Sequence, residues 1–131
     1  LKGILDEEDA QLAVKNGADA IVVSNHGGRQ LDGASSTISI LPTVVEAVGN
    51  DVEVWVDGGI RSGQDILKAI ALGAQGTMIG RPFLYGLGAL GEKGVTKCLE
   101  IIHKELDFSM ALCGHRNICE VDKKIIQSVK F

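Results

Sequence analysis

No stretch of the sequence approaches the roughly 20 consecutive apolar residues of a membrane-spanning helix, so a transmembrane protein is not expected. There is also no surplus of basic residues. The 13 lysines and arginines stand against 17 aspartates and glutamates, and the net charge of −4 argues against nucleic acid or an anionic membrane surface as a partner. The three cysteines (Cys98, Cys113 and Cys119) include no pair with the two-residue gap of a zinc or redox motif. Reduced, partly buried thiols are therefore expected.

The remaining composition is that of a globular protein, with only two prolines and with 17 glycines that fall at the ends of periodic segments. The length of 131 residues fits one small domain or part of a larger one. The sequence begins with Leu1 rather than methionine, and its first five residues have the pattern of the end of a strand, so we expect that part of the protein precedes them. The chain does not end in the peroxisomal signal Ser-Lys-Leu, and a cytoplasmic or membrane-peripheral location is expected.

Short β-branched runs alternate with helical patterns along the chain. Strands are expected at 1–5, 18–23, 52–56 and 75–79. Helices are expected at 6–16, 39–48, 62–72, 83–90 and 94–113, with a last short helix in 120–128. This alternation predicts an α/β fold with a parallel sheet and right-handed crossovers, and repeated units of this size favour a (βα)8 TIM barrel over a doubly wound sheet. Since a complete barrel needs about 250 residues, residues 1–131 are predicted to be the C-terminal half of one barrel domain, from the end of strand 5 to helix 8.

Several local signals set the expected helix ends. Asp6 is predicted to cap the first helix, and Ser62 with Asp65 three residues later predicts a capping box for the third. Leu12 is expected on the apolar face of the first helix, and Pro42 is compatible with the second only near its start.

The predicted strand 18–23 ends in a polar segment, and the carboxyl ends of parallel strands are where active sites form in such folds. His26 can accept or release a proton near neutral pH, and Arg29 can grip a carboxylate with two hydrogen bonds. Gly27 and Gly28 allow a sharp turn and the close approach of a flat ligand. The segment is suited to proton chemistry on a carboxylic acid, although for a single histidine a loop whose side chains cap the neighbouring backbone is the simpler interpretation.

Two later strand exits have the features of a phosphate site. Asp57 ends one predicted strand, two glycines follow, and Arg61 lies just before a helix whose first N–H groups are expected to bind an anion. Gly80 and Arg81 repeat the arrangement one strand later. The carboxylate of Asp57 suits a sugar or ribityl hydroxyl. Lys2, among apolar residues, either faces a ligand or reaches solvent.

The segment 24–32 (SNHGGRQLD) resembles the active-site signature of the FMN-dependent L-2-hydroxy-acid oxidases and dehydrogenases. This family includes glycolate oxidase, lactate oxidase, L-lactate and mandelate dehydrogenases and flavocytochrome b2. The segments 2–3 (KG), 57–61 (DGGIR) and 80–82 (GRP) match its other motifs in order. The resemblance implies FMN as cofactor and the oxidation of a small L-2-hydroxy acid, such as lactate or glycolate, to the 2-keto acid.

The resemblance also implies roles for single residues. Lys2 would lie near flavin N1 and the C2 carbonyl, and Ser24 beside the ring. His26 would be the catalytic base, taking a proton either from the substrate Cα or from its hydroxyl as hydride leaves for flavin N5, and Arg29 would hold the substrate carboxylate. Asp57 would bind the ribityl chain, and the phosphate would be held by Gly59, Arg61, Gly80 and Arg81.

Other site residues of the family lie on strands 1 to 4, which this chain does not contain. They include tyrosines near the substrate, a second arginine and the aspartate that orients the histidine; Asp32 follows the motif and does not replace that aspartate. We therefore expect the isolated chain to be inactive, and its open sheet edges to pair with the N-terminal half of the barrel or with a second copy in a homo-oligomer. The alternatives are a non-catalytic FMN- or phosphate-binding half-barrel (a fragment or pseudoenzyme) and a different phosphate-binding barrel, which would leave His26 and Arg29 unexplained.

Overall fold

The computed structural model describes residues 1–127 and divides into two compact units. Unit 1 comprises Leu1–Ile60 and Gly73–Ile79, and unit 2 comprises Arg61–Leu72 and the described residues from Gly80 to the end of that range. No helix of the described residues is long and apolar enough to cross a membrane.

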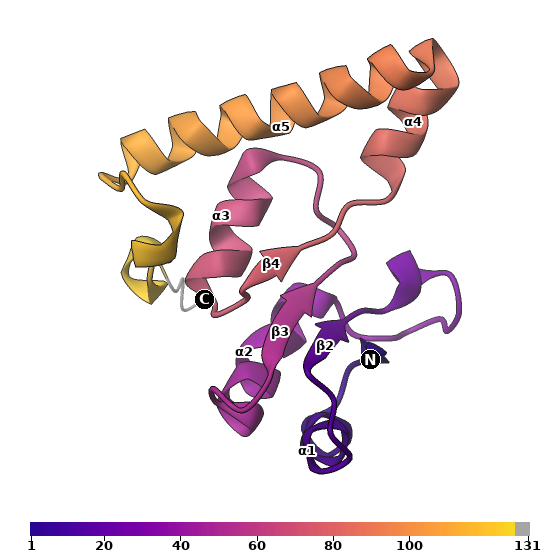
Figure 1. The fold of residues 1–131 in the computed structure, drawn as a ribbon, viewed down its shortest axis with the longest axis vertical. Helices are drawn as coiled ribbons and strands as arrows, with labels where there is room; N and C mark the ends of the chain where they lie inside the picture. The colour runs from indigo at the N-terminus through magenta and orange to yellow at the C-terminus, as the bar shows by residue number, and fades with distance from the viewer. Residues whose placement is uncertain (128–131) are drawn as a thin grey trace. The chain divides into compact units, whose positions relative to one another are not determined.

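Unit 1 is built on a parallel sheet. Its strands are β1 (Lys2–Ile4), β2 (Ala20–Val23), β3 (Glu53–Val56) and β4 (Gly76–Thr77), in the spatial order β1-β2-β3-β4 (Figure 1). This order follows the sequence, as consecutive right-handed βα units require. The predicted α/β fold with a parallel sheet is confirmed, and each strand is shorter than predicted, β4 most of all.

Two helices complete the core of unit 1. The helix α1 (Glu7–Lys15) packs against α2 (Thr37–Val48), and α2 packs against β2 and β3. The side chains fully buried between them are mostly β-branched or leucine: Ile21, Val23, Leu41, Val44, Val54 and Val56. Asp6 caps α1 as predicted, by accepting hydrogen bonds from the N–H groups of residues 8 and 9. The expected apolar position of Leu12 is wrong, because α1 turns its two alanines toward the core and leaves Leu12 55% exposed.

The start of α2 differs from the prediction for a tertiary reason. The helix begins at Thr37, two residues early, and Pro42 therefore lies in its second turn. Thr37 is buried, and its hydroxyl donates to the carbonyl of Gly58 at 3.0 Å. A contact with a distant strand exit thus stabilises the first turn of α2, and the local sequence does not predict this contact.

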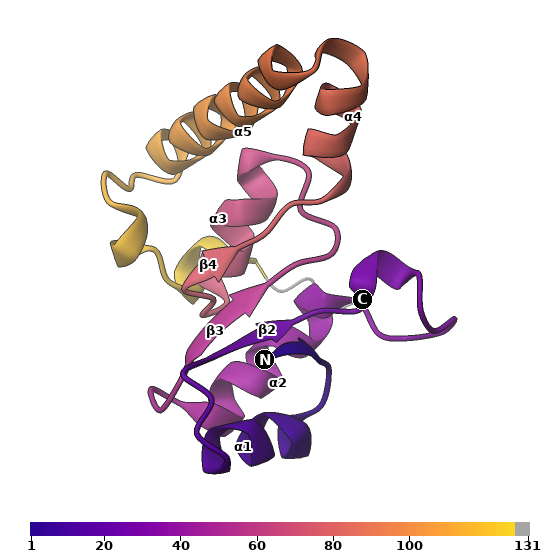
Figure 2. The same ribbon diagram turned by 45° about the vertical axis from the view of Figure 1, so that its right-hand side comes forward.

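Unit 2 is helical. The helix α5 (Glu92–Leu112) lies against both α3 (Gly63–Ala71) and α4 (Arg81–Leu90), as Figure 2 shows. Close approach requires glycine at these crossings. A Cβ at Gly63 would lie 1.9 Å from the backbone nitrogen of Leu106, and one at Gly94 would lie 1.8 Å from the carbonyl oxygen of Gly86.

The predicted last helix at 120–128 is wrong for the residues described; Ser128 lies outside them. Two 3-10 turns, η2 (Ile118–Glu120) and η3 (Lys123–Ile125), replace it, because Asn117 and Asp122 each cap a separate turn. The backbone N–H and the ammonium of Lys124 lower the pKa of Asp122 by hydrogen bonding to it. Between the turns, Val121 is extended and buried against α3.

All three cysteines are free, as predicted. Of the three, only Cys98 is partly buried, so the expected burial is wrong for the other two. Cys113 is exposed just after the last residue of α5, and Cys119 is exposed on η2.

Candidate active site

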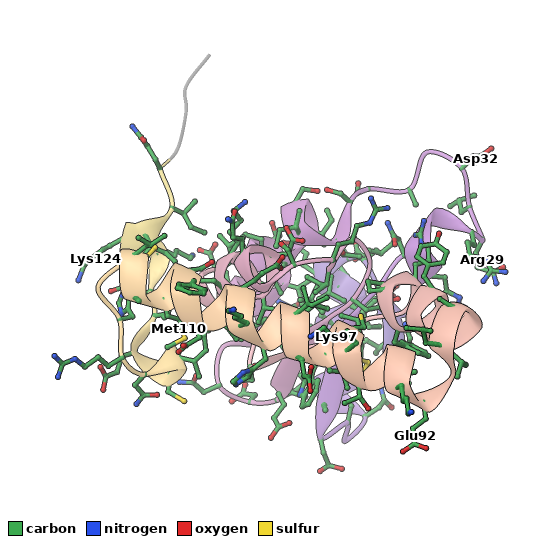
Figure 3. The ribbon with its side chains drawn as sticks, turned by 90° about the horizontal axis from the view of Figure 1, so that it is seen from above. Arg29, Asp32, Glu92, Lys97, Met110 and Lys124 are labelled. Atoms are coloured by element: carbon green, nitrogen blue, oxygen red, sulfur yellow. The ribbon has the colours of Figure 1, made fainter. Side chains whose placement is uncertain are left out.

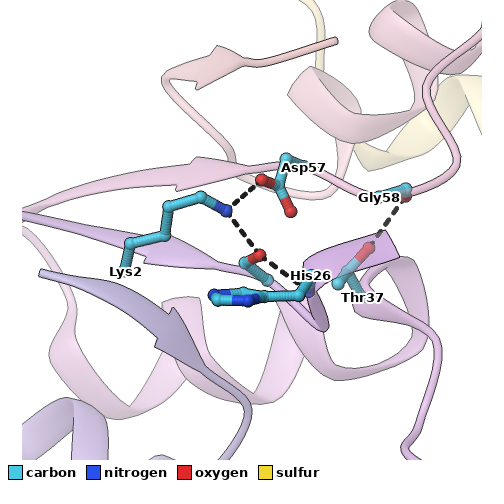
Figure 4. A network of polar contacts seen from close by, with 6 residues as sticks. Lys2, His26, Thr37, Asp57 and Gly58 are labelled. Atoms are coloured by element: carbon cyan, nitrogen blue, oxygen red, sulfur yellow. Dashed lines mark hydrogen bonds and ion pairs between the residues drawn. The ribbon is translucent and has the colours of Figure 1, made fainter. Parts of the chain in front are cut away.

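Side chains from three neighbouring strands of unit 1 meet in one polar network. Ser24 directly follows β2, and Asp57 directly follows β3, so adjacent parallel strands bring them side by side. Lys2 reaches both from β1: its Nζ donates to Ser24 Oγ at 2.7 Å and forms an ion pair with the Asp57 carboxylate (Figure 4). Ser24 is fully buried, whereas 18% of the Asp57 side chain and 44% of the Lys2 side chain are exposed. The structure thus turns the Lys2 ammonium toward a carboxylate, while nearly half of its side chain stays exposed to solvent.

His26 is tied to the same network through its backbone. Its N–H donates to Ser24 Oγ at 3.2 Å. Its φ angle is +55°, and among the described residues it is the one non-glycine residue with positive φ. Such a conformation costs about 1–3 kcal/mol and persists where the surroundings impose it, commonly at functional sites. The imidazole is exposed, near Gly3, and hydrogen bonds to none of residues 1–127.

The turn after β3 contains an unsatisfied acceptor. Asp57 Oδ1 is buried and has no hydrogen-bond partner among the described residues, whereas Oδ2 accepts from Lys2. A buried acceptor without a donor costs about 1–3 kcal/mol, so such atoms usually meet a ligand or water. Gly59, two residues on, is exposed, and its φ angle is +90°.

Arg29 does not join this network. It lies on the exposed loop between η1 (His26–Gly28) and α2, where Figure 3 shows it projecting outward with Asp32. Its side chain forms no hydrogen bond or ion pair with the described residues. Gly27 and Gly28, with φ angles of +69° and +73°, give the backbone this course. The structure therefore assembles Lys2, Ser24, Asp57 and the His26 backbone, and leaves Arg29 apart.

In unit 2, the predicted anion site at the start of α3 is not open. The Asp65 carboxylate accepts hydrogen bonds from the N–H groups of Arg61 and Ser62, each at 3.0 Å. Ser62 completes the predicted capping box, and Glu105 of α5 accepts from the N–H of Gly63 at 3.0 Å. The chain's own carboxylates and hydroxyl therefore occupy the positions that a phosphate would need at this helix start.

The start of α4 is different. Its N-cap is Gly80, and no side chain of the described residues caps it. Arg81 is exposed at the first helical position. Backbone N–H groups at such a helix start, next to an arginine, suit an anion. Of the two predicted phosphate-binding strand exits, the one at Gly80 and Arg81 keeps the better geometry for that role.

Sequence reasoning assigned no role to Asn25, Thr37 or Glu105. Each contacts a backbone group of a segment distant in sequence, and no local pattern predicts such contacts. Among residues 1–127, no group of three or more His, Cys, Asp and Glu side chains is placed to hold a metal ion.

The family of this chain follows from its similarity to known proteins. The model of the family described as FMN-dependent dehydrogenase matches residues 1–128. The chain belongs to this family. FMN is accordingly the cofactor expected at the site, and the resemblance read from the strand-exit motifs is confirmed.

Individual relatives are similar to this chain over nearly all of its length. It is 53% identical to 2-hydroxyacid oxidase 1 of Mus musculus over 97% of the chain and 34% of the relative, and 50% identical to L-lactate dehydrogenase of Caulobacter vibrioides over 96% and 33%. A structure of a mandelate oxidase mutant with a monooxide FMN adduct superposes with a TM-score of 0.88 at 53% identity, over 90% of this chain and 38% of that one. The chain thus spans about a third of the length of these relatives.

Within each unit, the residues described above fit a part of FMN. In unit 1, the buried and unpartnered Asp57 Oδ1 suits a ribityl hydroxyl, and the partly exposed Lys2 ammonium provides positive charge beside it. In unit 2, the uncapped start of α4 with Arg81 suits a phosphate.

Proposed function

We propose that this chain supplies flavin- and substrate-binding side chains to an enzyme that oxidises a small L-2-hydroxy acid, such as lactate or glycolate, to the 2-keto acid. The observation that carries the proposal is the Lys2–Ser24–Asp57 network with His26 attached to it. A cation and an unsatisfied acceptor lie together at one end of the sheet, and Figure 4 shows Lys2 reaching toward Asp57 with His26 beside this network.

FMN, when bound, takes up the two electrons that leave the substrate as its C–H and O–H bonds break and the C=O bond forms. The His26 imidazole accepts a proton from the substrate in either order of bond breaking, from Cα or from the hydroxyl. The Arg29 guanidinium holds the substrate carboxylate with two parallel hydrogen bonds. Lys2 supplies positive charge where negative charge develops, and Asp57 Oδ1 accepts a hydrogen bond from a ribityl hydroxyl.

For the phosphate we propose Gly59, Arg61, Gly80 and Arg81. The exposed Gly59 backbone and the uncapped start of α4 support this set. Because Asp65 and Glu105 occupy the start of α3, Arg61 contributes through its guanidinium rather than through its own N–H.

We further propose that residues 1–131 belong to the C-terminal half of one (βα)8 barrel domain. In the described residues β1 and β4 are the edges of the sheet, and unpaired edges are covered in stable proteins. The remaining strands of the barrel, or a second copy of the chain, would pair with them. The chain alone is then expected to be inactive.

A chimera tests the function: this chain replaces the matching third of 2-hydroxyacid oxidase 1 from Mus musculus. After loading with FMN, anaerobic bleaching of the flavin absorbance by lactate or glycolate is the readout. We expect bleaching by the chimera and none by the 131-residue chain alone. His26→Gln should slow bleaching about 100-fold or more, as for a lost general base.

The control is His103→Gln, because His103 is an exposed histidine on α5. It should leave the rate unchanged. Two outcomes would support a non-catalytic FMN-binding module instead. In one, the chimera binds FMN but no 2-hydroxy acid bleaches it; in the other, His26→Gln leaves the bleaching rate unchanged.

A further inference from the structure

The loop of residues 25–36, between β2 and α2, is attached at both ends to the turn that follows β3. At its start, Asn25 Oδ1 lies so close to Gly58 that a Cβ there would be 2.8 Å away. Just past its end, Thr37 Oγ1 donates to the Gly58 carbonyl at 3.0 Å. Both ends of this loop therefore meet at one residue of the neighbouring strand exit.

Apart from the short 3-10 turn η1, the loop is irregular. The side chains of residues 26–36 are all exposed or half-buried, so none is anchored in the core. Gly27, Gly28 and Gly33 have positive φ angles, and glycine loses the most conformational entropy when it is ordered. The position of Arg29, which lies in this loop, must therefore depend on contacts at the loop's base.

Asn25 closes that base. Its Nδ2 donates to the carbonyl of Ser35, ten residues away, at 3.2 Å, and its own carbonyl accepts from the N–H of Gly28 at 2.9 Å. The amide orientation follows from the network, because only Nδ2 can donate to a carbonyl. Asn25 Oδ1 is consequently directed away from solvent, where it is buried and unpartnered among the described residues.

We propose that Asn25 is a positioning residue. By joining the two ends of the 25–36 loop it orders the segment that carries Arg29, so that the guanidinium is placed to pair with a 2-hydroxy- or 2-keto-acid carboxylate. The ordering of the loop stands on the contacts of Asn25, whereas its consequence for carboxylate binding rests on the proposed function.

Trypsin tests the loop directly in the 131-residue chain, because the bond after Arg29 lies within it. Asn25→Ala removes the side chain, and Asn25→Asp keeps its shape but not the donor. Both should speed cleavage after Arg29 about 10-fold, since cleavage follows local opening and a tenfold change corresponds to one lost hydrogen bond. Asn50→Ala, an exposed asparagine in the turn after α2, is the matched control and should change nothing.

Cleavage after Lys15, in α1, reports general unfolding. If Asn25→Ala speeds cleavage at both sites alike, the substitution has destabilised the whole chain. The milder Asn25→Asp then tests whether Asn25 orders the loop. Cleavage after Arg29 at the wild-type rate in Asn25→Asp would overturn the proposal.

In the FMN-loaded chimera, the dissociation constant of pyruvate, followed by the perturbed flavin spectrum, should rise about 10-fold in Asn25→Asp while the FMN content stays unchanged. Unchanged pyruvate affinity would overturn the link to Arg29. A chimera that binds FMN but oxidises no 2-hydroxy acid would contradict the proposed function, and the trypsin rates would still judge the role of Asn25 in the loop.

Discussion

Lys2 and Asp57 form an ion pair that joins β1 to the exit of β3 across the intervening strand β2. Ser24, at the exit of β2, bonds to the same ammonium. One cation thus connects three consecutive strands of the sheet at the point where the cofactor and substrate are proposed to bind.

Replacing the cation should destabilise unit 1. In Lys2→Met the partly buried Asp57 carboxylate loses its ionic partner, and we expect the free energy of unfolding to fall by about 1–2 kcal/mol, between the values for exposed and buried pairs. Urea denaturation measures it. Lys97→Met is the control, because the pair of Lys97 with Glu100 is exposed and its loss should be nearly neutral. Equal effects of the two substitutions would contradict the structural role of Lys2.

His26→Gly should separate stability from activity. Glycine adopts the positive φ of residue 26 without steric cost, so the free energy of unfolding should rise by about 0.5–1 kcal/mol although the proposed base is lost. His103→Gly, within α5, should instead lower it by about 1 kcal/mol. Denaturant titrations of both variants decide, and a fall in stability for His26→Gly would show that position 26 carries no backbone strain.

Glycines at helix crossings should not tolerate a methyl group. Gly63→Ala places Cβ against the backbone of Leu106, which cannot move aside as a flexible side chain would, and we expect a loss of about 3 kcal/mol. Gly88→Ala, on the exposed side of α4 with no atom within 4 Å of the new Cβ, should gain about 0.5–1 kcal/mol from better helix propensity. The thermal midpoints of the two variants should therefore move in opposite directions.

The phosphate assignment predicts a ligand preference. In the chimera, Arg81→Ala should weaken FMN binding by on the order of 10-fold or more and leave riboflavin binding nearly unchanged, because a charge-assisted contact to phosphate is lost. Arg116→Ala, an exposed arginine after α5, is the control. Fluorescence titration of both flavins gives the comparison, and an equal loss for FMN and riboflavin would place the phosphate elsewhere.

Local signals in the sequence predicted the features that depend on neighbouring residues alone, such as the helix caps. The caps at Asp6 and Ser62 form as predicted, because a side chain bonding to the N–H of a residue two or three positions on needs no distant partner. The errors arose where distant contacts prevail. Thr37 starts α2 early through its bond to Gly58, and Val121 is held extended in the core of unit 2 between two short turns.

The candidate site divides in the same way. The polar residues after two predicted strands indicated His26 and Asp57, because active sites form at strand exits in parallel α/β folds. Ser24 was given its place beside the flavin ring only through the family resemblance. Three contacts could not be predicted from the sequence. They are those of Lys2 with Ser24 and Asp57, of Asn25 across the base of the loop, and of Glu105 with the start of α3.

The sequence by itself thus determined the family, the parallel strand order and the residues at the strand exits, since these follow from motifs and hydrophobic periodicity. Only the tertiary structure decided that Lys2 turns to Asp57, that Asn25 and Thr37 meet at Gly58, and that Glu105 accepts a hydrogen bond from the N–H of Gly63 at the start of α3. Each of these depends on atoms that lie close in space but far apart along the chain, and no spacing in the sequence encodes their distance.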